Sequence, residues 1–367
     1  MKKSLITNLL VLGGAIAASF CLVEGVARIL MPEWGPRTAH LSSFWQFDST
    51  YGWSHVKGIR GDFTMDGRKT DISINSKGFR GPEVQYEPQA GTQRIVVLGD
   101  SLVWGFGVEY EDTFQAKLQR AFDSVEVIGL GVSGYSTDQE LILYRNEARK
   151  YRPDLVIQVV ASNDLPGNLS TEEYLIYSKP AFVVSDGKLV PVNQPVVRTA
   201  WLKRMFVQVA WRSYVLTGIQ RVYYQTIVEK KGLPNQAGGE PQGKVSQKRF
   251  GLAPVSRSVA WQMTLRLLQE TKAEAEKDGA VYVVVFADGL NISEEVERYI
   301  KNLGFDAVFL DHYLDPQDTT THLSDLIHWS PKGNALVAKA ILEHIGKMNS
   351  SKFKVSTQAH PLESVSK

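Results

Sequence analysis

The sequence predicts an α/β protein built on a parallel sheet, preceded by a segment apolar enough to cross a membrane. Three observations support this prediction. Short apolar runs typical of buried strands alternate with amphipathic helical stretches between residues 93 and 347. Several of these runs end in polar clusters, where ligands of open α/β sheets bind. Residues 5–23 are almost continuously apolar, close to the length that spans a bilayer.

The bulk composition is that of an ordinary globular protein. Hydrophobic residues make up 43% of the 367 positions and charged residues 22%. The net charge of +2, without a basic stripe interleaved with aromatic residues, gives no reason to expect a nucleic-acid partner. The single cysteine, Cys21, excludes an intramolecular disulfide and a cysteine-based zinc site.

Residues 1–31 are predicted to form an uncleaved transmembrane anchor. Lys2 and Lys3 precede the apolar run, and the positive-inside rule keeps them in the cytoplasm. The rest of the chain is therefore expected on the periplasmic side of the cell membrane. A secretory signal peptide, cleaved at residues 15–17 or 17–19, is the alternative, and a buried soluble helix is a third. We favour the anchor because the apolar pattern continues past both cleavage sites.

Residues 32–92 are predicted to be a membrane-proximal segment of small β structure and loops. Within it, residues 70–82 have the pattern of a short strand followed by a turn, with Ile72 and Ile74 on one face. Residues 85–93, QYEPQAGTQ, are expected to link this segment to the main domain.

The main domain, residues 93–347, opens with a β-α-β-α-β pattern. The predicted strands are IVVL at 95–98, VEVIGLGV at 125–132 and DLVIQVVAS at 154–162, and the predicted helices cover 113–122 and 139–150. This order indicates a parallel, doubly wound sheet. The polar residues that follow the strands should then gather along one edge of the sheet.

An insertion interrupts this pattern at about residues 166–255. It begins with a predicted hairpin around Asp186-Gly187. Residues 201–230 are amphipathic and rich in aromatic residues and arginine, and we expect one long helix or a pair that caps the core. A membrane-surface or partner-binding helix is the alternative. Residues 235–247 have no periodicity and are expected to be a loop.

The α/β pattern resumes after the insertion. Predicted helices at 258–279 and 294–303 alternate with predicted strands at 280–287 and 307–313. The last helix is expected to begin with Ser330 as its N-cap and Pro331 in its first turn. The polar residues 348–367 are expected to be a disordered tail.

Four polar blocks contain the candidate catalytic residues. They are Gly99-Asp100-Ser101, Ser133-Gly134, Ser162-Asn163-Asp164 and Asp325-x-x-His328. A serine hydroxyl becomes a useful nucleophile when a neighbouring base takes its proton, and an imidazole titrates near neutrality. A carboxylate three residues before the histidine can hold its tautomer. Ser101, His328 and Asp325 are therefore predicted to be nucleophile, base and orienting acid.

With these four blocks in this order, the chain resembles the SGNH hydrolases, also called GDSL esterases. The resemblance covers about residues 93–165 and 256–347. It implies a flavodoxin-like three-layer α/β/α sandwich, and an oxyanion hole formed by the backbone N–H groups of Ser101 and Gly134 and the side-chain amide of Asn163. The chain departs from the family pattern at Ala161, where glycine is usual, and at Gly129, where asparagine is common.

The same residues also have purely structural interpretations. Ser101 is a good helix N-cap, Gly134 a good turn residue and Asn163 a good cap or turn residue. His312, His322, Asp325 and His328 form an alternative candidate metal cluster. That cluster leaves Ser101 without a role, so the sequence predicts no metal and no cofactor.

The predicted function is a serine-dependent esterase or deacetylase that works through an acyl-enzyme. Its expected substrates are acyl esters, with O-acetyl groups of an envelope glycan or lipid as the specific expectation. An O-acyltransferase that modifies an extracytoplasmic polysaccharide is the first alternative, since a sugar hydroxyl can replace water as acceptor. A non-catalytic envelope scaffold is the second alternative.

Overall fold

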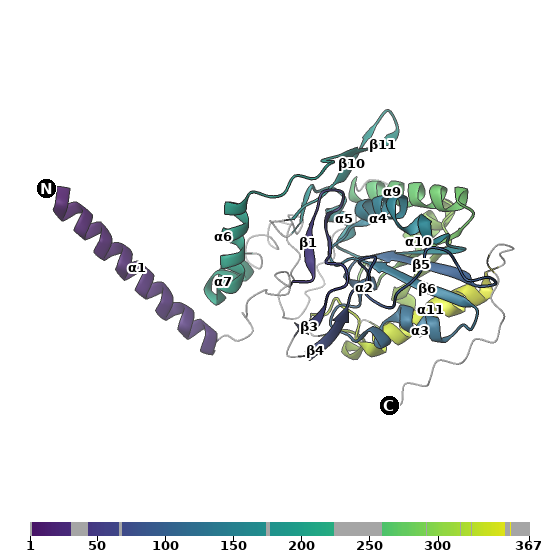
Figure 1. The fold of residues 1–367 in the computed structure, drawn as a ribbon, viewed down its shortest axis with the longest axis horizontal. Helices are drawn as coiled ribbons and strands as arrows, with labels where there is room; N and C mark the ends of the chain where they lie inside the picture. The colour runs from purple at the N-terminus through teal and green to yellow at the C-terminus, as the bar shows by residue number, and fades with distance from the viewer. Residues whose placement is uncertain are drawn as a thin grey trace. The chain divides into compact units, whose positions relative to one another are not determined.

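The computed structural model describes residues 2–30, 43–65, 68–173, 177–223, 259–290, 292–315, 317–323, 325–348 and 353. The chain divides into two compact units (Figure 1). The smaller consists of residues 1–42 and 199–235, and the larger of residues 43–198 and 236–367. The loop expected at 235–247 lies outside the described residues, as does most of the expected tail.

A five-stranded sheet forms the centre of the larger unit (Figure 1). Its strands are β5 (Gln93–Gly99), β6 (Val125–Gly131), β7 (Leu155–Val160), β12 (Val281–Phe286) and β13 (Ala307–Phe309). They lie in the order β13-β12-β7-β5-β6, and all neighbours are parallel. This is the flavodoxin-like order, in which the chain starts inside the sheet and winds outward in both directions. The predicted fold class is confirmed.

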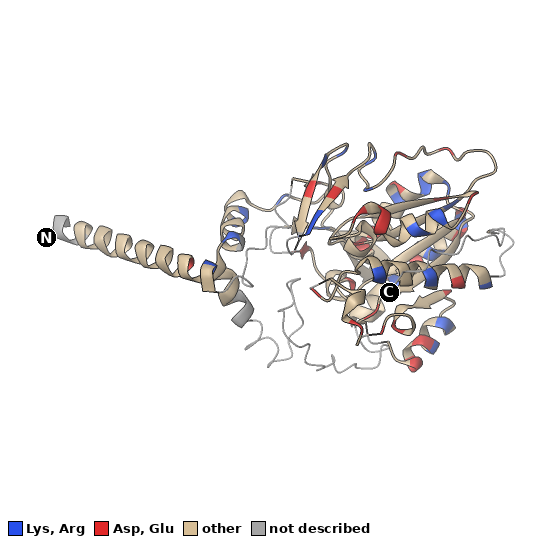
Figure 2. Ribbon diagram, turned by 90° about the horizontal axis from the view of Figure 1, so that it is seen from below, with Lys and Arg blue, Asp and Glu red and all other residues tan. Residues whose placement is uncertain are grey.

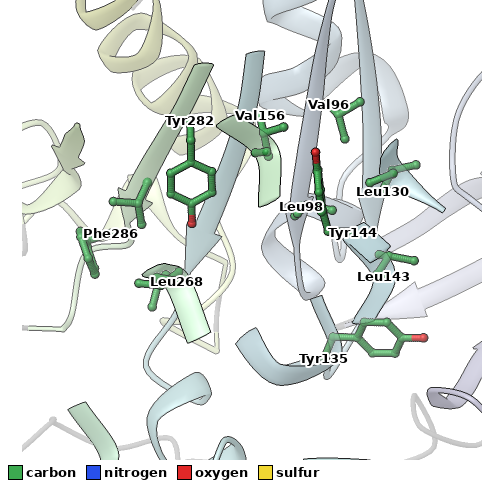
Figure 3. Packing of buried hydrophobic residues seen from close by; sticks show 14 of the residues in the cluster. Val96, Leu98, Leu130, Tyr135, Leu143, Tyr144, Val156, Leu268, Tyr282 and Phe286 are labelled. Atoms are coloured by element: carbon green, nitrogen blue, oxygen red, sulfur yellow. The ribbon is translucent and has the colours of Figure 1, made fainter. Parts of the chain in front are cut away.

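Helices cover both faces of the sheet. On one face pack α4 (Thr137–Asn146), α9 (Val259–Lys277) and α10 (Glu294–Asn302), and on the other α3 (Phe114–Arg120) and α11 (Pro331–Lys347). Because successive strand residues point to opposite faces, Val96 and Leu98 join the first core and Ile95 and Val97 the second. Figure 3 shows part of the first core.

Two elements end earlier than the sequence pattern predicts. The helix expected to run to Lys150 leaves helical geometry at Glu147 (φ −134°, ψ −55°) and continues as a 3-10 turn at Ala148–Tyr151. The strand expected at 307–313 ends at Phe309, and Leu310–His312 form a 3-10 turn. Beyond that point Asp311 accepts a hydrogen bond from the Gly289 N–H (3.1 Å), and His312 bonds Glu297 (2.6 Å). These side-chain contacts replace the strand pairing that the apolar pattern predicted.

The segment before the sheet forms two antiparallel hairpins. They pair β1 (Trp45–Asp48) with β2 (Gly52–His55) and β3 (Arg60–Met65) with β4 (Arg68–Ser73). Ile72 and Ile74 are both buried, as their shared face predicted.

The expected linker is fastened to the domain by one side chain. The buried guanidinium of Arg94 donates to the carbonyl oxygens of Gln85, Tyr86 and Glu87, at 2.5 to 3.1 Å. Arg94 also pairs with Glu126, at 2.7 Å. In a free linker these carbonyl groups would hydrogen-bond to water. Here the buried guanidinium donates those hydrogen bonds instead.

The first part of the insertion also belongs to the larger unit. Its β10 (Ala181–Ser185) and β11 (Lys188–Val192) form the predicted hairpin. Asp186 and Gly187 both have positive φ, at 49° and 75°, which is the geometry of a type I′ turn. Phe182 packs against α4 and α9 through Ile142 and Leu267.

The smaller unit contains α1 (Lys2–Leu30), α6 (Trp201–Arg212) and α7 (Tyr214–Tyr223). The amphipathic stretch after residue 200 is therefore a pair of helices, broken at Ser213. By length and composition, Ile6–Leu30 of α1 is able to cross a membrane, with a mean hydropathy of 2.1. Such a helix is compatible with an anchor or with a signal sequence. That the pair caps the core stays a prediction.

Candidate active site

Ser101 lies at the carboxyl edge of the sheet, immediately after β5. It is the first residue of the short helix α2 (Ser101–Trp104). The helix N-cap is Asp100, whose carboxylate accepts a hydrogen bond from the Leu102 N–H at 2.9 Å. Gly105 ends the helix in the left-handed region, with φ at 77°, and a Cβ there would lie 2.4 Å from the Thr113 methyl group. The glycine lets the chain turn away directly behind the serine.

A hydrogen-bonded chain connects Ser101 to His328 and Asp325. His328 Nε2 lies 2.8 Å from Ser101 Oγ, although 227 positions separate the two residues. On the other side of the ring, His328 Nδ1 bonds Asp325 Oδ2. A carboxylate is an acceptor only, so Nδ1 carries the proton and Nε2 presents its lone pair to the hydroxyl. The geometry is that of a nucleophile, a base and an orienting acid.

The second oxygen of Asp325 is held by the backbone of its own loop. Oδ1 accepts from the N–H groups of Ile327 (3.1 Å) and His328 (3.0 Å). Burial acts to raise the pKa of Asp325, but the hydrogen bonds from His328 and this backbone outweigh it and hold the pKa below its ordinary value of 3.8. Asp325 is therefore ionised at neutral pH.

The loop that carries His328 is tied to strand β12 by Asp288. Its carboxylate accepts from the Trp329 indole N–H (2.8 Å) and pairs with His322 Nε2 (2.9 Å). Leu326, between the two triad residues, has a φ of 59°, a strained conformation for a non-glycine residue. Asp288 is not among the residues predicted from the sequence, although its place directly after a predicted strand was an available signal.

Phe106 is a further neighbour of His328 and is not among the residues predicted from the sequence. Its ring stacks on the His328 imidazole, with 4.4 Å between ring centroids and 23° between planes. Only proximity in space shows this contact, because no spacing rule relates residues 106 and 328.

The three predicted oxyanion-hole residues follow the adjacent strands β5, β6 and β7. Gly134 occupies a turn in which the Tyr135 N–H donates to the Val132 carbonyl (3.0 Å), and its φ of 80° requires glycine in such a turn. The turn begins beside Ser101, because the Val132 N–H donates to the Gly99 carbonyl (3.1 Å). Among the described residues, the N–H groups of Ser101 and Gly134 donate to no protein acceptor.

The Asn163 side chain lies at the same edge of the sheet. It follows β7 and precedes the short helix α5 (Asp164–Gly167). Its side chain hydrogen-bonds the Asp100 carboxylate. The site thus lies at the carboxyl ends of the neighbouring strands β5 and β7. Between these two strands the chain reverses its direction of winding, and ligands of such sheets usually bind at this switch point.

The segment before the sheet holds the loops of this site. Trp53 donates its indole N–H to the Ser133 carbonyl (3.0 Å), and the Tyr135 hydroxyl donates to the Trp53 carbonyl (2.6 Å). Arg80 donates to the carbonyls of Gly105 (2.6 Å) and Val108 (2.7 Å), in the segment that follows α2. This segment lies outside the part of the chain that resembles the family. It nevertheless supports the loops that contain the predicted site residues.

Three carboxyl groups are fully or almost fully buried behind the site: Asp100, Glu140 and Asp164. Burial raises the pKa of each, and their mutual repulsion adds to the effect for Glu140 and Asp164. Asp164 accepts from the Ala161 N–H (2.6 Å) and the Thr137 hydroxyl (3.1 Å), so it braces the loop that holds Asn163.

The alternative metal cluster is not assembled. His312 bonds Glu297 and His322 pairs with Asp288, each away from the Asp325–His328 pair. Within the residues that the structure describes, no group of three or more His, Cys, Asp or Glu side chains is placed to hold a metal ion.

No family model matches the chain. No curated protein matches it either. The search of solved structures finds chains similar to this one at 10–13% identity.

One of these is a member of the lipolytic protein G-D-S-L family from Veillonella parvula DSM 2008, with a TM-score of 0.37 and 13% identity over 70% of this chain and 100% of that one. Another is the psychrotrophic esterase EstA from Pseudoalteromonas sp., with a TM-score of 0.38 and 12% identity over 70% and 97%. A third is a GDSL-like lipase from Bacteroides thetaiotaomicron VPI-5482, with a TM-score of 0.36 and 13% identity over 71% and 91%. Scores this low assign neither family nor activity, so the function is argued from the site.

Proposed function

We propose that this chain is a serine ester hydrolase of the SGNH type. The observation that supports it best is the continuous chain from Ser101 Oγ through the His328 imidazole to Asp325. A serine that served only as a helix N-cap would not need an imidazole from 227 positions away at 2.8 Å. The Ser101 hydroxyl also lies at the carboxyl edge of a parallel sheet, where a substrate can approach.

In the proposed reaction, Ser101 Oγ attacks the ester carbonyl carbon while His328 Nε2 takes the hydroxyl proton. The tetrahedral intermediate collapses, the C–O bond to the alcohol breaks, and His328 returns the proton to the departing alkoxide. Water then attacks the acyl-serine, giving its proton to His328, and collapse releases the carboxylic acid and restores Ser101. The sum is ester plus water to acid plus alcohol.

The oxyanion of each intermediate would be stabilised by the N–H groups of Ser101 and Gly134 and by the Asn163 amide. The absence of protein acceptors for those two N–H groups, among the described residues, supports this assignment. Donors that are already oriented before reaction need no reorganisation when charge develops.

We further propose that the substrate is an acyl ester of the cell envelope, with an O-acetyl group on a glycan or lipid as the specific case. The support is the apolar helix α1, able to cross a membrane by length and composition. We propose that α1 remains as a single-pass anchor with the catalytic unit on the periplasmic side.

The test uses the full chain in detergent with p-nitrophenyl esters of rising acyl length, alongside Ser101→Ala. We expect turnover in the wild type and none above background in the variant. A fluorophosphonate probe should add one adduct, and peptide mass mapping should place it on Ser101. Equal turnover by both proteins would remove the nucleophile assignment. Acyl transfer to an added glycan, followed by mass, would instead favour the acyltransferase.

A further inference from the structure

In the smaller unit, helix α7 is fastened to α1 through one carboxylate. Glu24 accepts hydrogen bonds from the Ser213 hydroxyl (2.8 Å) and from the backbone N–H groups of Tyr214 (3.0 Å) and Val215 (3.1 Å). Arg28, one turn later in α1, bonds the same carboxylate at 3.1 Å. A negative side chain that caps a helix N-terminus satisfies free N–H groups and complements the helix dipole. The start of α7 is therefore held at Glu24.

Glu24 lies where α1 would leave the bilayer. About 20 residues cross the hydrocarbon core, and a span counted from Ile6 ends next to Glu24. Charged side chains are costly deeper in the bilayer. Figure 2 shows α1 without charged residues along most of its described length, with acidic and basic residues near its C-terminal end. Because Ser213 alone separates α6 from α7, α6 must end at this same boundary.

Helix α6 carries an apolar stripe that is exposed among the described residues. Its five members are 42–67% exposed: Trp201, Leu202, Met205, Phe206 and Val209. At about 100° per residue, they fall within an arc of roughly 140°. The helix has three basic residues, Lys203, Arg204 and Arg212, and no acidic one. A large apolar face combined with basic side chains is typical of helices that lie in a membrane interface.

We propose that α6 is a second membrane contact, lying in the interface of the bilayer that α1 crosses, with its apolar stripe toward the acyl chains. Lys203 and Arg204 lie outside the stripe and would meet anionic lipid headgroups. Arg212 would extend its charged end to the headgroup layer from the last turn. The inference rests on α1 being a membrane helix, and it is independent of the proposed ester hydrolysis.

The test measures depth in the bilayer with nitroxide spin labels on the full chain, in nanodiscs of phosphatidylcholine with phosphatidylglycerol. The single cysteine, Cys21, is replaced by serine in every labelled protein. The first protein carries Ile16→Cys, at an exposed position near the middle of a span counted from Ile6. Two further proteins carry Cys21→Ser together with Val209→Cys, in the middle of the stripe, or Lys203→Cys as the matched control. Collisions with oxygen report burial in lipid, and collisions with a water-soluble nickel chelate report exposure to water.

We expect the label at 209 to have an oxygen-to-nickel collision ratio at least about fivefold above that at 203, with the label at 16 deeper than both. If the labels at 209 and 203 are equally open to nickel while 16 is deep, the interface proposal fails and the anchor stands. If 209 is shielded from both reagents, protein covers the stripe and the proposal also fails. If 16 is open to nickel, the anchor itself is wrong. Far-UV circular dichroism of each variant checks that the helices are retained.

Discussion

At the scale of single residues, the site depends on which groups donate each hydrogen bond and which groups accept it. Asp325 uses both carboxylate oxygens, one for the His328 ring and one for the backbone N–H groups of Ile327 and His328. The backbone donors determine which atom of an amide replacement would face the ring, because an amide N–H₂ cannot accept from them.

For this reason Asp325→Asn should lower kcat by about 10⁴-fold. The amide oxygen would stay with the backbone donors, and the amide N–H₂ would face His328 Nδ1 and move the ring proton to Nε2. That tautomer cannot take the Ser101 proton. Ester turnover checks the prediction, and the exposed Asp315→Asn is the matched control, expected to retain wild-type kcat. A fall of less than tenfold in D325N would contradict the assignment.

Asn163→Ala should lower kcat by about 10²–10³-fold, with KM changed little, because the amide stabilises charge that exists only in the transition state. Steady-state kinetics on one ester separates the two constants. The control is Ser162→Ala, which alters the exposed neighbour of Asn163. A rise in KM with an unchanged kcat in N163A would instead assign the amide to substrate binding.

At the scale of elements, a buried ion pair joins the start of α4 to the segment before β10. Lys179 Nζ lies 2.5 Å from Asp138 Oδ2, and both side chains have no solvent exposure. The ammonium also donates to the Gly167 carbonyl at 2.9 Å, at the end of α5. Burial raises the pKa of Asp138, and Lys179 opposes this. The pair thus connects the insertion to two elements beside the catalytic edge.

Lys179→Met should lower the free energy of unfolding by about 3–5 kcal/mol, since it leaves a carboxyl group buried without its cation. Adding Asp138→Asn should recover part of that loss. Urea denaturation of the two variants measures both effects. Lys188→Met changes an exposed lysine of β11 and should stay within about 0.5 kcal/mol of wild type. If Lys179→Met is as stable as wild type, the ion pair contributes nothing to the free energy of unfolding.

At the scale of the whole molecule, the buried acids behind the site make stability depend on pH. Glu140 accepts from Gln158 at 2.7 Å, and its pKa lies well above the ordinary 4.5 because of burial and the nearby Asp164. The folded state therefore keeps a proton that the unfolded state loses above pH 4.5. Stability must fall as pH rises through this interval.

Glu140→Gln should remove that fall, because glutamine has nearly the shape of a protonated glutamate and does not ionise. At pH 4 the variant and the wild type should have the same free energy of unfolding. As the pH rises, the variant should become more stable than wild type by about 1.4 kcal/mol per pH unit, up to the pKa of Glu140 in the folded state. Denaturant titrations between pH 4 and pH 8 measure it. A difference that does not change with pH would show that Glu140 ionises normally.

The sequence by itself determined the fold class, the hairpin at Asp186-Gly187 and the residue types able to do ester chemistry. Apolar periodicity and turn residues act locally, so a short window of sequence contains them. The sequence could not set where α4 and β13 end, because side-chain contacts such as that of His312 with Glu297 override the local pattern.

Only the tertiary structure decided the acidic partners of His312 and His322. The sequence paired Asp325 with His328, but it offered His312 and His322 no partner outside the alternative metal cluster. The tertiary structure also placed Phe106 on the His328 ring and made the β1–β2 hairpin a support for the Gly134 turn. The physical reason is distance along the chain: contacts between residues tens to hundreds of positions apart depend on how whole elements pack, which no local pattern encodes.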